Sequence, residues 1–183
     1  MSYFLFIVVV FFNFLLVSYK IFIRGVFMIR LVNKNDVPQI MELLNQILLV
    51  HHHLRPDLFK DRGSKYTFEQ LEDIISNPQT PVFVYVDDNN NVLGHCFTII
   101  NDVPRSLNLE PRKNLFIDDL CVNKNARGKQ IGTKLFNYVK EFAKSQGIYN
   151  ITLHVWEGND NAIEFYKKLG FNVQQTTLEV IIK

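Results

Sequence analysis

Residues 115–135 read LFIDDLCVNKNARGKQIGTKL. The first eight form an apolar run interrupted only by Asp118 and Asp119, which predicts a strand. Residues 127–132 carry two glycines, two cations and no acid, and an amphipathic helix is predicted to follow them. A strand that enters a helix through such a turn presents unpaired backbone N–H groups, and the helix dipole adds partial positive charge. We therefore expect this stretch to hold a phosphate or pyrophosphate.

The bulk composition indicates one ordinary globular domain. The chain has 183 residues, of which 48% are hydrophobic and 21% are charged, so a substantial core is expected. The net charge of +2 comes from Lys20 and Arg24, and the remaining 18 basic residues equal the 18 acidic residues. Such a neutral body argues against nucleic acid as the main partner. Cys96 and Cys121 form no CxxC pair, which favours two reduced thiols in a cytoplasmic domain over a zinc or redox site.

Residues 1–27 form a hydrophobic N-terminal segment, and they hold seven of the chain's 16 phenylalanines. A membrane-spanning helix needs about 20 apolar residues, and the run 3–23 reaches that length only by including three polar ones. If the segment is a membrane anchor, the basic residues that follow it would leave the domain facing the cytoplasm. We favour the alternative that Met28 is the true start, because the composition changes there. Either way, the folded domain is expected to cover residues 28–183.

From Met28 onward, strand and helix patterns follow one another in the order β-α-α-β-β-β-α-β-α-β. Apolar residues at helical spacing and the capping box of Thr67 and Gln70 predict the first two helices. The order indicates an α/β fold with a mixed sheet and helices on both faces. The predicted strands cover residues 28–32, 82–86, 92–100, 115–122 and 151–156, with one or two more over 171–182. Residues 101–113 are predicted to be a loop.

Two short segments carry a family resemblance. Residues 127–132 read RGKQIG, five residues after the expected strand end at Val122, and residues 159–171 read NDNAIEFYKKLGF. They resemble the acetyl-CoA signature and the later Asn–Ala–Tyr motif of the GCN5-related N-acetyltransferases, the GNAT family. The resemblance extends from Met28 to the C-terminus, and it departs from the family pattern at Gln130, where the family usually has Gly. Gln propagates a right-handed helix well, so the backbone anion site is expected to survive this change.

The resemblance implies a GNAT-like acyl-CoA N-acyltransferase fold and an acetyl-CoA-dependent N-acetyltransferase. It implies that backbone groups of Leu120 and Val122 hold the pantetheine arm of acetyl-CoA on a splayed strand. Tyr166 would protonate the departing CoA thiolate, although its spacing alone is that of a core aromatic residue. The residues expected at the cofactor are Leu120, Val122, Arg127, Gly128, Lys129, Gln130, Ile131, Gly132, Thr133, Asn159 and Tyr166.

Asp118 and Asp119 are the candidate catalytic acids beside Tyr166. They interrupt an apolar strand, where alternation would direct them to opposite faces of the sheet. Carboxylates are rarely buried without a partner, so one is expected to be structural, while the other binds the amine and accepts its proton directly or through water. Residues 117–120 resemble the Leu-Glu-Asp-Leu stretch of polyamine acetyltransferases, which favours a cationic amine substrate.

The remaining histidines and Cys121 are weaker candidates. Three adjacent histidines at residues 51–53 lack the i, i+4 spacing of a helical metal site, so no metal is expected. One of them, or Arg55 or Asp57, would contact the substrate if the following loop borders the acceptor site. His95 and His154 are expected to be satisfied structural residues on strands. Cys121 has no neighbouring base and is expected to be a small apolar residue in its strand.

The expected substrates are acetyl-CoA and a primary amine of a small molecule that resembles a polyamine or an aminoglycoside. Three alternatives stay open: a non-catalytic module that binds or senses acyl-CoA, a protein N-terminal or lysine acetyltransferase, and a membrane-tethered enzyme that uses residues 1–27. The sequence leaves the oligomeric state open, with a homodimer among the alternatives.

Overall fold

The computed structural model describes residues 28–182, so the hydrophobic segment 1–27 and its two interpretations lie outside the described residues. The predicted strand and helix types are found as far as residue 168. The strands are β1 (Met28–Leu31), β2 (Val82–Val86), β3 (Val92–Val103), β4 (Arg112–Val122) and β5 (Asn150–Leu153). The helices are α2 (Val37–Leu54), α3 (Phe68–Ser76), α4 (Ile131–Ser145) and α5 (Asp160–Lys168), with short 3-10 turns η1 (Lys34–Asp36) and η2 (Lys124–Ala126).

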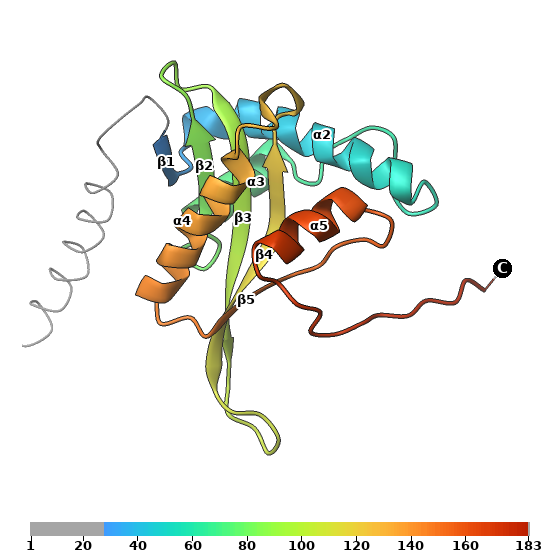
Figure 1. Ribbon diagram of the computed structural model, residues 1–183. Helices are drawn as coiled ribbons and strands as arrows, with labels where there is room; N and C mark the ends of the chain where they lie inside the picture. The colour runs from blue at the N-terminus through green and yellow to red at the C-terminus, as the bar shows by residue number, and fades with distance from the viewer. Residues whose placement is uncertain (1–27, 183) are drawn as a thin grey trace, which may run out of the picture.

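The five strands form one mixed sheet in sequence order, β1-β2-β3-β4-β5. The first four are antiparallel, and β5 runs parallel to β4 after the α4 crossover (Figure 1). The β3–β4 hairpin is longer than expected, because pairing continues to Val103 and Arg112 and shortens the predicted loop. β5 is shorter than expected and ends at Leu153. The sheet therefore has the predicted α/β arrangement with a long central hairpin.

Local sequence explains where the first two helices begin. The Asn33 side chain caps η1, and Asp36 accepts two hydrogen bonds from the Arg30 guanidinium at 2.6 and 2.9 Å. α2 then begins with Pro38 in its first turn, where proline loses no helical hydrogen bond. The capping box predicted at Thr67 and Gln70 is present at the start of α3.

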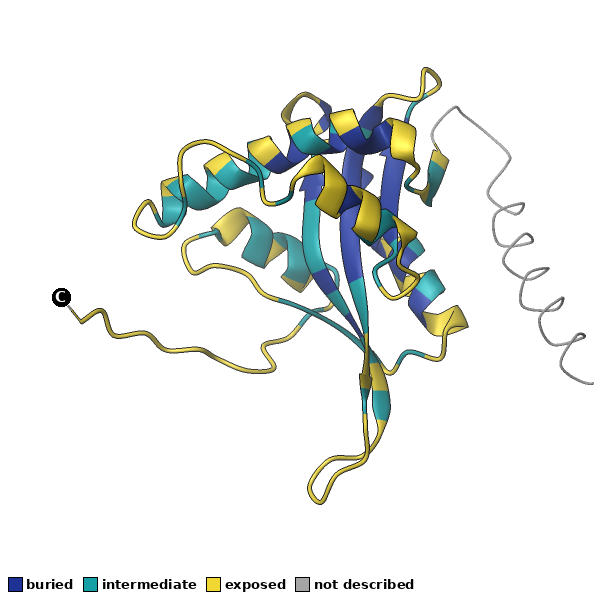
Figure 2. Cartoon of the chain, turned by 180° about the vertical axis from the view of Figure 1, so that it is seen from behind, coloured by how far each residue is buried: buried dark blue, intermediate teal, exposed yellow. Residues whose placement is uncertain are grey.

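Helices cover both faces of the sheet, as the element order predicted. One hydrophobic cluster joins α2 and α3 to one face, and its buried residues include Ile40, Leu44, Leu71, Val84 and Phe97. The second joins α4 to the other face, and its buried residues include Phe83, Leu115, Ile131, Leu135 and Val139. Figure 2 shows the buried residues along the central strands and the inward sides of these helices. Packed helices therefore cover both faces of the central strands.

Two irregularities in β4 shape the end of the strand that carries Asp118 and Asp119. Phe97 pairs with Asp119 while Thr98 pairs with Ile117, so Asp118 is the extra residue of a β-bulge. On the other edge, the parallel pairing with β5 ends at Ile117 and Leu153. Beyond that point, β4 continues for five residues, 118–122, with β3 as its only strand neighbour in the described sheet.

The final strands predicted over residues 171–182 are absent. Residues 172–182 adopt neither helix nor strand, and they extend away from the sheet (Figures 1 and 2). Residues that favour strands do not form one alone, because a strand also needs a neighbour with which to exchange backbone hydrogen bonds. Within residues 28–182, no helix has the length and apolarity needed to cross a bilayer.

Candidate active site

The turn before α4 has the features of an anion site. Its first intrahelical hydrogen bond runs from the Lys134 N–H to the Gln130 carbonyl, 3.0 Å. The N–H groups of residues 130–133 donate to no group in the part of the chain that the structure describes, as expected for a helix N-terminus. Gly128, with φ 79°, has no atom within 4 Å of where a Cβ would stand. Free backbone donors thus lie at the positive end of the helix, with open space beside Gly128.

The backbone at Gln130 corrects one prediction and explains why the family pattern has glycine at this position. It is the N-cap of α4 and has left-handed dihedrals, φ 60° and ψ 19°, instead of the right-handed ones expected. Glycine adopts this conformation without steric cost, whereas other residues lose about 1–2 kcal/mol. The family's usual glycine therefore matches the backbone found here, and Gln130 carries a strain that glycine would not.

Side chains around this turn pack it against its neighbours. The Arg127 Nε donates to the Val122 carbonyl at 3.4 Å, so this side chain folds back onto the end of β4. A Cβ on Gly132 would stand 3.2 Å from Phe165 of α5 and 3.6 Å from Leu120. Gly132 thus allows α4, α5 and β4 to converge. Leu120 and Val122 pack against the α4 core cluster, and their strand lacks a β5 partner.

Tyr166 and Asn159 reach this region from α5. The Asn159 Oδ1 caps the helix by accepting from the Ala162 N–H at 3.3 Å, so its oxygen has a structural role. Tyr166 packs on Phe165 and Phe171, with ring centroids 5.1 and 5.5 Å apart. Burial raises the pKa of Tyr166 above its usual value, with further contributions from Cys96 and Asp119. The phenol therefore keeps its proton at neutral pH and can act as a proton donor.

The two acids lie on the same face of the sheet, which corrects the prediction of opposite faces. The bulge at Asp118 interrupts the alternation, so both residues lie on the α2–α3 side. The Asp118 Oδ2 accepts from the Tyr66 hydroxyl and the Lys65 Nζ, each at 2.7 Å. Burial, with this hydrogen bond, raises the pKa of Tyr66. Asp118 already holds a primary ammonium group, which is the kind of group that an amine substrate would present.

Asp119 is buried beside His95, and the surroundings of this histidine correct another prediction. Its Oδ2 lies 3.4 Å from the His95 Nε2, and its side chain is only 7% exposed. His95 is fully buried, and its Nδ1 has no hydrogen-bond partner among the described residues. The expectation of a satisfied structural histidine therefore holds for Nε2, which contacts Asp119, and is wrong for Nδ1. His154 lies beyond the end of β5 and packs edge-on against Phe116, with ring centroids 5.0 Å apart.

The end of α2 brings a further group to the acids. His51 is half-buried, and burial lowers its pKa, while Asp119 opposes and Lys65 reinforces that shift. The imidazole is thus neutral at neutral pH and can accept a proton. Arg55 is already engaged by Asp57 at 2.7 Å and Glu179 at 3.0 Å, and it lies over Trp156.

The structure gives Cys121 the predicted inert role. Cys121 is buried, and its thiol lies 3.6 Å from the Leu43 carbonyl. Burial raises the pKa of Cys121 to about 12, so it is a thiol at neutral pH. Within residues 28–182, no three His, Cys, Asp or Glu side chains are grouped as a metal site.

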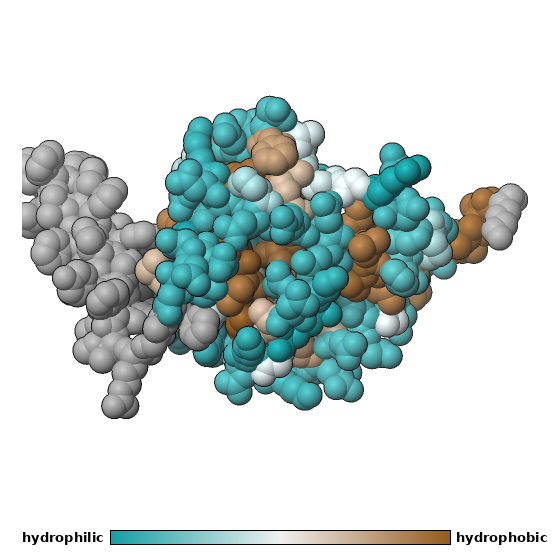
Figure 3. All heavy atoms as spheres, turned by 90° about the horizontal axis from the view of Figure 1, so that it is seen from above, coloured by the Kyte–Doolittle hydropathy of each residue, from teal (hydrophilic) through white to brown (hydrophobic). Residues whose placement is uncertain are grey.

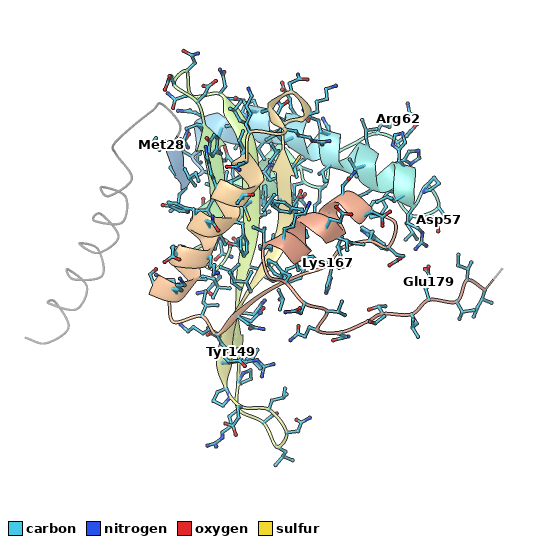
Figure 4. All side chains as sticks on the ribbon, viewed as in Figure 1. Met28, Asp57, Arg62, Tyr149, Lys167 and Glu179 are labelled. Atoms are coloured by element: carbon cyan, nitrogen blue, oxygen red, sulfur yellow. The ribbon has the colours of Figure 1, made fainter. Side chains whose placement is uncertain are left out.

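Sequence reasoning missed the partners of the two acids. Lys65 and Tyr66 lie more than fifty residues before Asp118, in the loop ahead of α3, and no local pattern marks them. Figure 4 shows the side chains of the described residues on the ribbon. The only available signal was indirect: a carboxylate in an apolar strand needs a partner from elsewhere in the chain.

The model of the acetyltransferase (GNAT) family matches residues 47–171, more than half of the chain. The chain belongs to this family of acetyltransferases. The match begins in α2 and ends after α5, so it includes the bulged strand, the α4 turn and Tyr166.

Relatives with shorter matches are also named acetyltransferases. Identity is 41% over 68 residues to N-acetyltransferase MJ1207 of Methanocaldococcus jannaschii, which covers 37% of this chain and 30% of that protein. The chain is 39% identical over 66 residues to N-alpha-acetyltransferase 50 of Danio rerio, and the match covers 36% of this chain and 39% of that protein. It is 34% over 58 residues to thialysine N-epsilon-acetyltransferase of Bos taurus, covering 32% and 34%. These matches thus span well under two thirds of each relative.

Solved structures match over a longer range. A mutant form of the BH1408 protein from Bacillus halodurans superposes with a TM-score of 0.82 and 26% identity, over 85% of this chain and 99% of that one. An aminoglycoside acetyltransferase, meta-AAC0020 from a soil metagenome, solved with sisomicin, gives a TM-score of 0.66 at 18% identity, over 86% and 95%. The second likeness concerns the fold alone.

Replacing Gln130 tests the strain at the α4 turn. Gln130→Gly removes about 1–2 kcal/mol of left-handed strain and loses about 0.5–1 kcal/mol through added chain freedom, so the free energy of unfolding should hold or rise. Gln146→Gly is the matched control, because Gln146 has φ −91° at the other end of α4 and should only lose stability. Urea unfolding measures both. Equal destabilisation by the two changes would contradict the strain.

The pH dependence of stability tests the environment of His51. A lowered pKa means that the folded chain binds fewer protons here than the unfolded chain, so stability should fall as pH drops through about 6.5. His51→Gln should remove that part of the fall between about pH 7 and 5, while His53→Gln, at an exposed position, should leave it. Unfolding curves across this range give the slopes. An unchanged slope in His51→Gln would contradict the assignment.

Proposed function

We propose that the chain transfers an acetyl group from acetyl-CoA to a primary amine of a small molecule by direct attack in a ternary complex. The observation that carries the proposal is the parting of β4 from β5 after Ile117, beside the free N–H groups of the α4 turn. An unpaired strand edge can bind amide groups of an extended ligand, and the helix terminus can bind its phosphates. One ligand with both features is a coenzyme A thioester.

Residues on the α4 side would hold acetyl-CoA. Backbone groups of Leu120 and Val122 would bind the pantetheine arm, and those of residues 127–133 the pyrophosphate. Gly128 and Gly132 support this fit, because Gly128 leaves the approach open and Gly132 lets α4 pack tightly on α5. Asn159 and Tyr166 would contact the thioester end from α5.

The acids at the bulge would receive the acceptor. Asp118 binds the Lys65 ammonium at 2.7 Å, so an incoming cationic amine can exchange with that side chain while keeping the same charge pairing. The small-amine class is also supported by the likeness to a thialysine acetyltransferase and, at the level of the fold, to an aminoglycoside acetyltransferase. We therefore expect a polyamine-like or aminoglycoside-like acceptor.

In the proposed reaction, one proton leaves the amine and another reaches the sulfur of CoA. Asp118 or Asp119 takes a proton from the ammonium, directly or through water, and the neutral amine attacks the thioester carbonyl. A backbone N–H near Leu120 would stabilise the oxyanion that forms. As the carbon–sulfur bond breaks, Tyr166 gives its proton to the thiolate. Burial raises the pKa of the Tyr166 phenol, so the phenol keeps its proton until the thiolate forms.

A second candidate is acetylation of protein N-termini. It is favoured by the 39% identity over 66 residues to N-alpha-acetyltransferase 50. A third is a non-catalytic module that binds acyl-CoA without turnover. The three differ in acceptor, so one panel of substrates separates them.

The test is thiol release from acetyl-CoA against polyamines, thialysine, an aminoglycoside and a peptide with a free N-terminus. We expect the small amines to be turned over. Tyr166→Phe should lower kcat on the best of them by about 100-fold or more, because it removes the general acid while keeping the ring. Asp118→Asn should also lower turnover, because it removes the charge that binds the amine.

Tyr149→Phe is the matched control, since this tyrosine is 76% exposed and lies outside the proposed site. Calorimetric titration with CoA should show that Tyr166→Phe keeps its affinity within a few-fold. Full turnover by Tyr166→Phe would contradict its role as the acid. Turnover of the peptide alone would favour the second candidate, and CoA binding without any thiol release the third.

A further inference from the structure

Two hydrogen-bond donors share one oxygen of Asp118, and they differ in how firmly they are held. The Lys65 Nζ and the Tyr66 hydroxyl both donate to the Asp118 Oδ2 at 2.7 Å. Tyr66 is half-buried, and its ring stacks on Phe97 with the centroids 5.8 Å apart. The Lys65 side chain is 42% exposed, and its ammonium lies 5.4 Å from the centroid of the Tyr66 ring. Tyr66 therefore fixes the loop on β4, whereas the Lys65 ammonium can leave without unpacking a ring.

Asp118 is accessible to a small cation from solution. Its side chain keeps 19% of its surface exposed while Lys65 is in place. The end of the C-terminal segment does not lie over the body, because it projects away from it in Figure 3. Glu179 of that segment pairs with Arg55 at 3.0 Å. An amine in solution can therefore reach the Asp118 carboxylate when Lys65 moves away.

The charges around Asp118 determine what such an exchange gains. In the described residues, the cation that pairs with Asp118 is Lys65, while Asp119 pairs with His95, which is charged only when protonated. A substrate ammonium that replaces Lys65 restores the same ion pair, so the exchange of one ammonium for another gains little electrostatic energy. Lys65 is tethered beside the carboxylate, and a short flexible tether gives an effective concentration on the order of millimolar. A simple amine must exceed that concentration to compete.

We propose that Lys65 is a built-in competitor of the acceptor: it occupies Asp118 when no acceptor is bound, and an amine must displace it. This inference rests on the proposed function, because it takes Asp118 as the carboxylate that binds the amine. Lys65 is then a specificity residue. A monoamine that offers only an ammonium group binds weakly, whereas an acceptor that makes further contacts in the site overcomes the competition.

Replacing Lys65 should tighten the binding of simple amines. Lys65→Met removes the ammonium and keeps an apolar stem of similar length. The dissociation constant of 1-butylamine should fall by about 10-fold, because the carboxylate then lacks a cation and attracts the amine more strongly. Lys65→Arg keeps the charge and should bind the amine no more tightly than the wild-type chain. Lys60→Met is the matched control, since Lys60 is exposed in the same loop and takes no part in the contacts of Asp118.

Calorimetric titration with 1-butylamine and with 1,4-diaminobutane, each in the presence of CoA, measures these constants without turnover. In an Asp118→Asn background, adding Lys65→Met should leave them unchanged, because the competition needs the carboxylate. Kinetics with acetyl-CoA give a second measurement. Lys65→Met should lower KM for the amine and keep kcat within about two-fold, whereas loss of a merely structural contact would lower kcat or the melting temperature. Circular dichroism melting verifies that each variant is folded.

The competition and the proposed reaction can fail separately. If amines are acetylated but Lys65→Met keeps the wild-type dissociation constant and KM, the competition is overturned and the reaction stands. If Lys65→Met tightens amine binding but no variant releases thiol, the competition stands and the reaction fails. Weaker amine binding by Lys65→Met would also overturn the inference, because Lys65 would then help to hold the substrate. The absence of amine binding by every variant would overturn it as well.

Discussion

The central strand β4 has β3 beside it along its whole length but β5 beside it only as far as Ile117. This difference leaves residues 118–122 with one unpaired edge, around which the candidate site is arranged. The last part of the strand keeps its place because β3 and both hydrophobic clusters hold it, while its other edge stays open toward α4 and α5. The glycines act at the same place. Gly94 lets β3 approach β4 and α4, since a Cβ there would stand 2.9 Å from the Cys121 carbonyl and 3.2 Å from the Leu135 side chain, and Gly132 does the same between α4 and α5.

The bulge at Asp118 adds the second constraint. Without it, regular alternation would direct one of the two adjacent carboxylates toward the α4 side of the sheet. With the bulge, both carboxylates lie on the α2–α3 side. There they have hydrogen-bonding or charged neighbours in Tyr66, Lys65, His95 and His51. Tyr166, the proposed proton donor, lies on α5, on the other side of the strand opening. The proposed amine site and the proposed proton donor thus lie on either side of one strand.

Local patterns predicted the strands and helices up to α5, the capping box of α3 and the turn before α4, because each depends on neighbouring residues. Three features could not be predicted in this way. The faces of Asp118 and Asp119 depend on the register with β3, and the left-handed Gln130 depends on how the chain must enter α4. The partners Lys65 and Tyr66 come from a distant loop. The strands predicted over residues 171–182 are absent for a related reason, since a strand depends on a distant neighbour and these residues pair with no strand of the described sheet.

The proposed function depends most on the binding of coenzyme A at the α4 turn and the open edge of β4. Amide NMR spectra recorded during a titration with CoA test it directly. We expect the largest shifts at residues 120–122 and 128–133, with little change at the other end of α4. A rival place exists in the hollow of about 410 Å³ between the β2–β3 hairpin and η2, lined by Asp87, Asp88 and Asn125 among others. Saturable binding that shifts residues 87–89 of the hollow, with Lys129, which also lines it, and leaves residues 120–122 and 130–133 unchanged would contradict coenzyme A binding at the α4 turn.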